Sequence, residues 1–104
     1  MREKIIEKGC KNAKKVIDRM KGSYDLSDVA EIISITKNLS LEIDCIRADL
    51  GDDECDPLTG FKNGTPLFFE LYVIKGDETV DGITSDIHSD ILSDVKYLLN
   101  CCVD

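Results

Sequence analysis

The apolar residues of this chain change their spacing twice, and this limits the folds open to it. From residue 3 to residue 21 they recur at alternating steps of four and three, at Ile6, Cys10, Ala13, Ile17 and Met20. Between residues 31 and 48 they alternate with polar residues, and from residue 84 a helical spacing returns. Steps of three and four share one helix face, whereas alternation marks one face of a strand. The pattern predicts a helix at each end with strands between.

The segment from Val29 to Leu50 fits two structures. Its apolar residues alternate with polar ones except at Lys37, and Ile, Thr and Ser favour extended backbone. With a tight turn at Lys37-Asn38, this predicts a hairpin of strands near 31–36 and 39–48. Apolar residues and Thr36 at heptad steps also fit one long helix, which would make the protein mostly α-helical with a β-hairpin.

The next segments read as a loop, two strands and a helix. Residues 49–66 are rich in Gly, Pro and acidic residues, and predict a loop. The run 67–74, LFFELYVI, predicts a central strand, and Gly76-Asp77 a tight turn into a strand near 78–83. The last helix is expected from Thr84, as its cap, to about Cys102. Its expected buried stripe is Ile83, Ile87, Ile91, Val95, Leu98 and Cys102.

We therefore predict an α+β fold: an N-terminal helix, an antiparallel meander of three to four strands, and a C-terminal helix, with both helices on one sheet face. A chain of 104 residues suits a single domain. Within it we distinguish a basic amphipathic helix (1–22), a mainly β region (23–83) with the acidic loop 49–66, and an acidic-edged helix (84–104).

The composition favours a cytoplasmic protein. No apolar run approaches the roughly 20 residues that a membrane span needs. The N-terminus, MREKIIEKGCKNAKK, carries charges where a secretory signal needs an apolar core. Five cysteines without paired spacing suit a reducing compartment.

Charge is divided unevenly along the chain. Residues 1–21 hold eight of the 13 basic and three of the 21 acidic residues, a net charge of +5, so the other five basic and 18 acidic residues leave 22–104 at −13. The basic residues form a ridge opposite the apolar stripe of the first helix: Lys4, Lys8, Lys11, Lys15 and Arg19. We expect this basic ridge to serve self-association, by docking on the acidic body of a second copy. Direct binding of nucleic acid is not expected, because the acidic body would repel it.

The acidic residues suggest a surface for a basic partner. In the stretch SDIHSDILSD the aspartates recur every fourth residue, which on a helix would line one edge of the buried stripe. We predict a partner-binding set from this edge and the preceding loop: Asp86, Asp90, Asp94, Tyr97, Asp52, Asp53, Glu54 and Asp56. Such carboxylates can compete for a cationic surface that otherwise grips nucleic acid. The alternative is an ordinary solvated face.

No catalytic constellation, metal motif or cofactor motif stands out, so we expect a protein that is not an enzyme and holds neither metal nor cofactor. The first functional hypothesis is a small acidic inhibitor or regulator of a basic, nucleic-acid-binding partner. In size and charge it is similar to phage anti-defence inhibitors, immunity proteins and antitoxins. The second is a small-molecule or nucleotide-binding module, in which the loop covers a sheet pocket lined by Phe61, Phe68, Phe69 and Tyr72.

Overall fold

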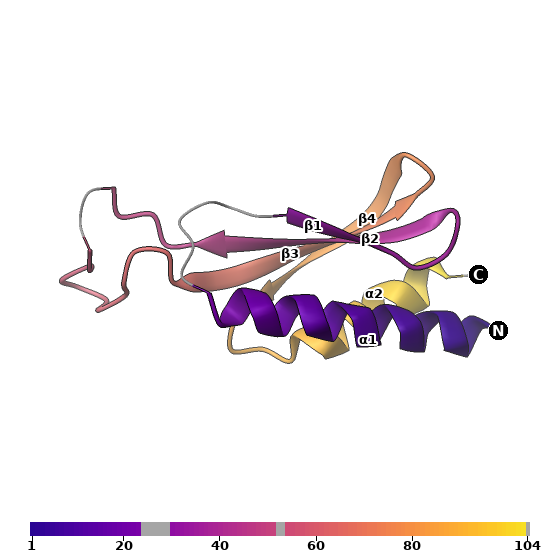
Figure 1. Ribbon diagram of the computed structural model, residues 1–104, viewed down its shortest axis with the longest axis horizontal. Helices are drawn as coiled ribbons and strands as arrows, with labels where there is room; N and C mark the ends of the chain where they lie inside the picture. Colours follow the sequence, from indigo (N-terminus) through magenta and orange to yellow (C-terminus); the bar gives the residue numbers. More distant parts are fainter. Residues whose placement is uncertain (24–29, 52–53, 104) are drawn as a thin grey trace.

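The computed structural model describes residues 1–23, 30–51 and 54–103. The elements follow in the order α1 (Arg2–Lys21), β1 (Ala30–Ser34), β2 (Leu39–Arg47), β3 (Pro66–Lys75), β4 (Glu78–Asp86) and α2 (Ile91–Cys102) (Figure 1). The four strands form one antiparallel sheet in the order β1-β2-β3-β4. The predicted α+β fold is confirmed, and residues 30–47 form a hairpin rather than a long helix.

Local sequence explains both hairpins. Residues 35–38 connect β1 to β2, close to the turn predicted at Lys37-Asn38. Gly76 and Asp77 connect β3 to β4, and Gly76 has a φ of +66°, which a residue with a Cβ rarely adopts. In β2 the buried residues are the odd-numbered ones from Leu39 to Arg47, and in β3 they include Phe69, Leu71 and Val73. Alternation therefore sends one set of side chains into the core and the other set to the opposite face.

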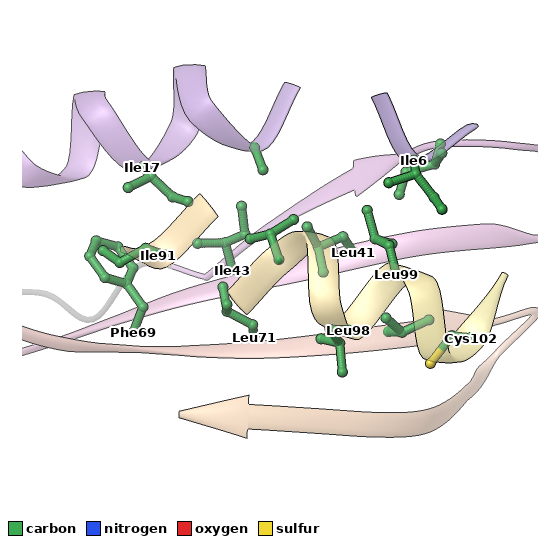
Figure 2. Close-up of a cluster of buried hydrophobic side chains, with 14 of the residues drawn as sticks. Ile6, Ile17, Leu41, Ile43, Phe69, Leu71, Ile91, Leu98, Leu99 and Cys102 are labelled. Carbon is green, nitrogen blue, oxygen red and sulfur yellow. The ribbon is translucent and has the colours of Figure 1, made fainter. Parts of the chain in front are cut away.

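Both helices pack on the same face of the sheet, as predicted. Helix α1 contacts β1 and β2, and α2 contacts β3 and β4. Figure 2 shows Ile17 of α1 and Leu98 and Leu99 of α2 gathered over Ile43 and Leu71 of the sheet. The helices come close where α1 carries Gly9, since a Cβ there would lie 2.6 Å from Cδ1 of Leu99. This absence of a side chain allows one continuous core beneath the sheet.

The predicted start of the last helix is wrong. Thr84 and Ser85 belong to β4, which pairs with β3 as far as Phe68 opposite Asp86, and α2 begins only at Ile91. The β-branched residues of the segment favour a strand, and that strand has β3 to pair with. The cap is Asp90, whose Oδ1 accepts a hydrogen bond from the backbone N–H of Ser93 at 3.2 Å. Ile83 and Ile87, placed by prediction in the helical stripe, reach the core from β4 and the turn after it.

The buried Arg47 joins three segments. Its Nη2 donates to Met20 O at 3.0 Å, and its Nη1 donates to Ser23 O at 2.5 Å and to Gly64 O at 3.2 Å. The carbonyls at the end of α1 thus receive a charged donor, which also suits the negative end of the helix dipole. The same side chain fixes the base of the loop between β2 and β3, residues 48–65, which extends beyond the end of the sheet in Figure 1.

Candidate functional site

The aspartates of SDIHSDILSD do not stack along one helix. Asp86 ends β4 and its Oδ1 accepts from the backbone N–H of His88 at 2.8 Å. Asp90 caps α2, and Asp94 lies in its first turn. Each position has a local explanation, because a carboxylate stabilises a turn, a helix N-terminus and the positive end of the dipole. The four-residue spacing therefore arises from consecutive turns and caps, and the predicted acidic edge does not exist as a single helical feature.

The other predicted partner-binding residues divide between α2, where Tyr97 lies three residues after Asp94, and the loop between β2 and β3. Tyr97 is 63% exposed on α2, and Glu54 and Asp56 lie in the loop 48–65, while Asp52 and Asp53 fall outside the described residues. Asp56 accepts from Leu58 N at 2.9 Å and from Thr59 Oγ1 at 3.0 Å. These bonds, that from Leu58 first, lower the pKa of Asp56 below its usual range. Among the described residues of the predicted set, Asp86, Asp90, Asp94 and Tyr97 belong to the end of β4 and to α2, whereas Glu54 and Asp56 belong to the loop.

A different set of acids does converge, on the sheet face opposite the helices. Glu42 and Asp44 of β2 and Glu70 of β3 all occupy positions that alternate with the buried residues. Antiparallel pairing sets Asp44 directly opposite Glu70, and Glu42 opposite Tyr72. Like charges that face each other across strands repel, and Asp44 and Glu70 are such a pair.

Tyr72 is held within this group by a glycine. A Cβ on Gly82 of β4 would lie 2.5 Å from Cδ1 of Tyr72, so the ring rests over a residue without a side chain. The hydroxyl of Tyr72 donates to Oε2 of Glu70 at 2.9 Å. This bond is the largest cause of a raised pKa at Tyr72, followed by desolvation and by the negative charges of Glu70, Asp44 and Glu42. The tyrosine therefore stays protonated and keeps its hydrogen bond to Glu70.

Apolar side chains flank the acids on the same face. Ile32 of β1 is 63% exposed, and Ile46, Phe68 and Ile74 are half-buried. We name the whole surface the acidic sheet face, and its residues are Ile32, Glu42, Asp44, Ile46, Phe68, Glu70, Tyr72 and Ile74. It combines an apolar contact area with carboxylates and one positioned hydroxyl. Such a surface can bury a partner's apolar side chains while pairing with its lysines and arginines.

Sequence reasoning missed this face as a site. In the sequence, Glu42 and Asp44 are polar residues that alternate with the apolar residues of a predicted strand. Glu70 is the one charged residue in LFFELYVI. Their meeting depends on the register between β2 and β3, which join residues more than twenty positions apart. The available signal was a charge in a strand expected to be central.

The basic ridge is partly engaged within the chain. Nζ of Lys8 donates to Ile35 O at 3.0 Å, and Arg19 forms an ion pair with Glu31 of β1. Lys4, Lys11 and Lys15 are exposed. In the described chain no ion pair joins the ridge to Glu54, Asp56, Asp86, Asp90 or Asp94. These five described acids therefore form no ion pair with the first helix.

The four aromatic residues predicted to line one pocket do not share one face. Phe69 is fully buried in the core, whereas Phe68 and Tyr72 belong to the opposite face, as strand alternation requires. Phe61 of the loop and Phe68 instead line a cavity of about 440 Å³ at the end of the sheet, together with Lys21, Asp86 and His88. The loop does contribute an aromatic side chain to a cavity, with partners that sequence reasoning did not predict.

The cysteines show no metal site. Cys45 and Cys102 are buried, Cys10 is half-buried, and Cys55 and Cys101 are exposed. Burial is the main cause of a raised pKa at Cys10 and Cys102, so both thiols stay protonated near neutral pH. Across residues 1–23, 30–51 and 54–103, no three His, Cys, Asp or Glu side chains are grouped to hold a metal ion.

Comparison with known proteins gives no family. No family model, curated protein or solved structure matches this chain. None of the helices in the described ranges combines the length and hydropathy of a membrane span.

Proposed function

We propose that this chain is a small protein-interaction module that inhibits or regulates a basic, nucleic-acid-binding protein by covering its cationic surface. The acidic sheet face is the surface through which it acts. The observation that carries the proposal is the convergence of Glu42, Asp44 and Glu70 on the face opposite the helices.

The arrangement favours a protein partner over a nucleic acid. The body of the chain carries −13 in residues 22–104, which repels a polyanion and attracts a basic surface. Exposed Ile32 beside the acids gives the contact an apolar component, which a phosphate backbone would not use. Association steered by charge is fast at low ionic strength and weakens as salt is added.

Partner capture tests the proposal. The chain is immobilised and incubated with a lysate of its native host at about 50 mM and about 500 mM NaCl, where screening lengths differ several-fold. The captured protein is identified by mass spectrometry and purified, and its Kd is measured by calorimetry. We expect a basic protein, tighter binding at low salt, and competition by the partner's own nucleic acid.

A charge-matched pair of variants locates the interface. Glu42→Gln with Glu70→Gln removes two charges from the acidic sheet face, whereas Asp77→Asn with Asp81→Asn removes two exposed charges near the β3–β4 turn. The first pair should raise Kd roughly tenfold and the second pair much less. Equal effects of the two pairs would contradict the proposed surface.

A further inference from the structure

The cavity at the end of the sheet is assembled from four parts of the chain. Lys21 comes from the end of α1, Phe61 from the loop 48–65, Leu67 and Phe68 from β3, and Asp86 and His88 from the end of β4 and the turn after it. Its volume of about 440 Å³ falls within the range of about 300–1,000 Å³ typical of ligand pockets.

Hydrogen bonds order the backbone locally on each side of the cavity. The backbone N–H of Ile87 donates to Leu67 O at 3.2 Å, and Asp86 lies directly opposite Phe68 in the sheet. On the loop side, the carbonyl of Phe61 accepts from Asp56 N at 2.8 Å and its N–H donates to Thr59 Oγ1 at 3.3 Å. A cavity whose walls are fixed in this way loses little entropy when it is filled.

The lining selects a cation with an apolar stem. The face of an aromatic ring is negative and attracts ammonium and guanidinium groups, and two phenyl rings line this cavity. Asp86 supplies a carboxyl group, whose Oδ1 accepts a hydrogen bond from the backbone N–H of His88, and this bond orients the side chain. The net charge of −8 draws cations toward the molecule as a whole. Among the described lining residues, Lys21 opposes a cation, from an exposed position at the end of α1.

We propose that this cavity binds a guanidinium or ammonium group, with Phe61 and Phe68 against its stem and Asp86 as its counter-ion. The inference rests on the proposed function for the source of the cation, which is an arginine or lysine side chain of the basic partner. That side chain anchors the partner at the end of the sheet, beside the acidic sheet face, which shares Phe68 with the cavity.

Nuclear magnetic resonance titration tests the cavity directly. The probes are N-acetyl-arginine amide and N-acetyl-citrulline amide, which has nearly the same shape without the charge. A probe of this size should bind with a Kd on the order of 1 mM. We expect saturable shifts at the amides of Phe61, Phe68 and Ile87 with the arginine probe only. Equal shifts with citrulline, no saturable shift, or shifts confined to the amides of Glu42 and Glu70 would overturn the inference.

Variants assign the roles of the lining residues. Asp86→Asn keeps the acceptor for His88 N but removes the charge, and should weaken the arginine probe about tenfold. Phe61→Ala should weaken it several-fold, whereas Lys21→Ala should strengthen it. Asp77→Asn and Leu58→Ala are the controls, since Asp77 lies in the β3–β4 turn and Leu58 is 94% exposed and does not line the cavity. If Asp77→Asn weakened binding of the arginine probe as much as Asp86→Asn did, the net negative charge of the protein would account for the binding. The proposed site would then be refuted.

Two further titrations distinguish a partner side chain from a small molecule as the source of the cation. Together with partner capture, they also distinguish failure of the cavity site from failure of the proposed function. Agmatine, a free small molecule with a guanidinium at one end and an ammonium at the other, is compared with an arginine-containing peptide of the captured partner. Tighter binding of the peptide supports a partner side chain, and tighter binding of agmatine supports the cation site with a small-molecule ligand. A captured partner that binds Phe61→Ala as well as the original chain leaves the proposed function standing and removes the anchor. If the cavity binds the arginine probe but capture yields no basic partner, the cation site stands and the proposed function is contradicted.

Discussion

At the scale of single residues, the side chain of Arg47 connects three separate segments of the chain. Its guanidinium donates to three carbonyl oxygens, those of Met20, Ser23 and Gly64. The planar fork of arginine suits this task, because it presents several donors in fixed directions, whereas a lysine ammonium is a single compact group. Sequence reasoning had no means of finding this role, since Arg47 reads as an ordinary polar residue at the end of a strand.

Replacing Arg47 should be among the most destabilising single changes. Arg47→Met leaves the three carbonyls without their charged donor, and we expect the free energy of unfolding to fall by about 2–4 kcal/mol. Urea denaturation followed by circular dichroism measures the change. Arg19→Met is the matched control, because the Arg19–Glu31 pair lies at the surface and should contribute at most about 1 kcal/mol. A loss at Arg47 no larger than that at Arg19 would contradict the role assigned to it.

At the scale of elements, the boundary between β4 and α2 shows where apolar spacing alone fails to predict secondary structure. Ile83, Ile87, Ile91 and Val95 recur every fourth residue, so the spacing predicts one continuous helix. The chain instead buries the first two from a strand and a turn, because β4 pairs with β3 as far as Asp86. Local spacing cannot reveal that pairing, which depends on a neighbouring strand.

Elements whose periodicity has one interpretation were predicted well. Helix α1 matches its apolar stripe, and β3 matches the run LFFELYVI. The Ile, Thr and Ser content of residues 30–47 favours a hairpin over a helix, and the structure confirms the hairpin. The candidate site was not predicted, because the meeting of Asp44 with Glu70 depends on register.

Capping variants test the corrected start of α2. Asp90→Ala removes the bond to Ser93 N and should lower the free energy of unfolding by about 1 kcal/mol. Thr84→Ala should have little effect of this kind, because Thr84 lies exposed in β4. Asp90→Asn, which keeps the acceptor, should restore most of the loss in the same urea experiment. If Thr84→Ala lowered the free energy of unfolding more than Asp90→Ala did, the helix would begin at Thr84, as the spacing predicts.

At the scale of the whole molecule, the division of charge along the chain becomes a division between layers. Helix α1 carries the exposed basic residues Lys4, Lys11 and Lys15, and the opposite sheet face carries Glu42, Asp44 and Glu70. The core separates the two layers, so the carboxylates are kept together although basic residues exist in the same chain. Their mutual repulsion is a cost to folding that a cationic partner would relieve.

Salt should therefore stabilise the free protein. Screening weakens repulsion among the acids, and the attraction lost at surface pairs such as Lys14–Asp18 and Arg19–Glu31 is small. We expect the urea midpoint to rise between about 0.05 M and about 0.5 M NaCl.

The variant Glu70→Gln gives this expectation its control. It should gain about 0.2–1 kcal/mol at low salt and respond less to added NaCl, because one member of the opposed pair has lost its charge. A midpoint that falls with salt, or that responds equally in both proteins, would show that repulsion across the sheet does not limit stability.

The hydrogen bonds of Arg47 also connect two walls of the cavity. Lys21, which lies one residue after Met20, and Phe61, which lies in the loop whose base is held at Gly64, both line that space. The last turn of α1 and the base of the loop should therefore open as one cooperative unit in amide hydrogen exchange. An occupant that bridges the two walls would slow exchange in both segments at once, although they lie some forty residues apart in the chain.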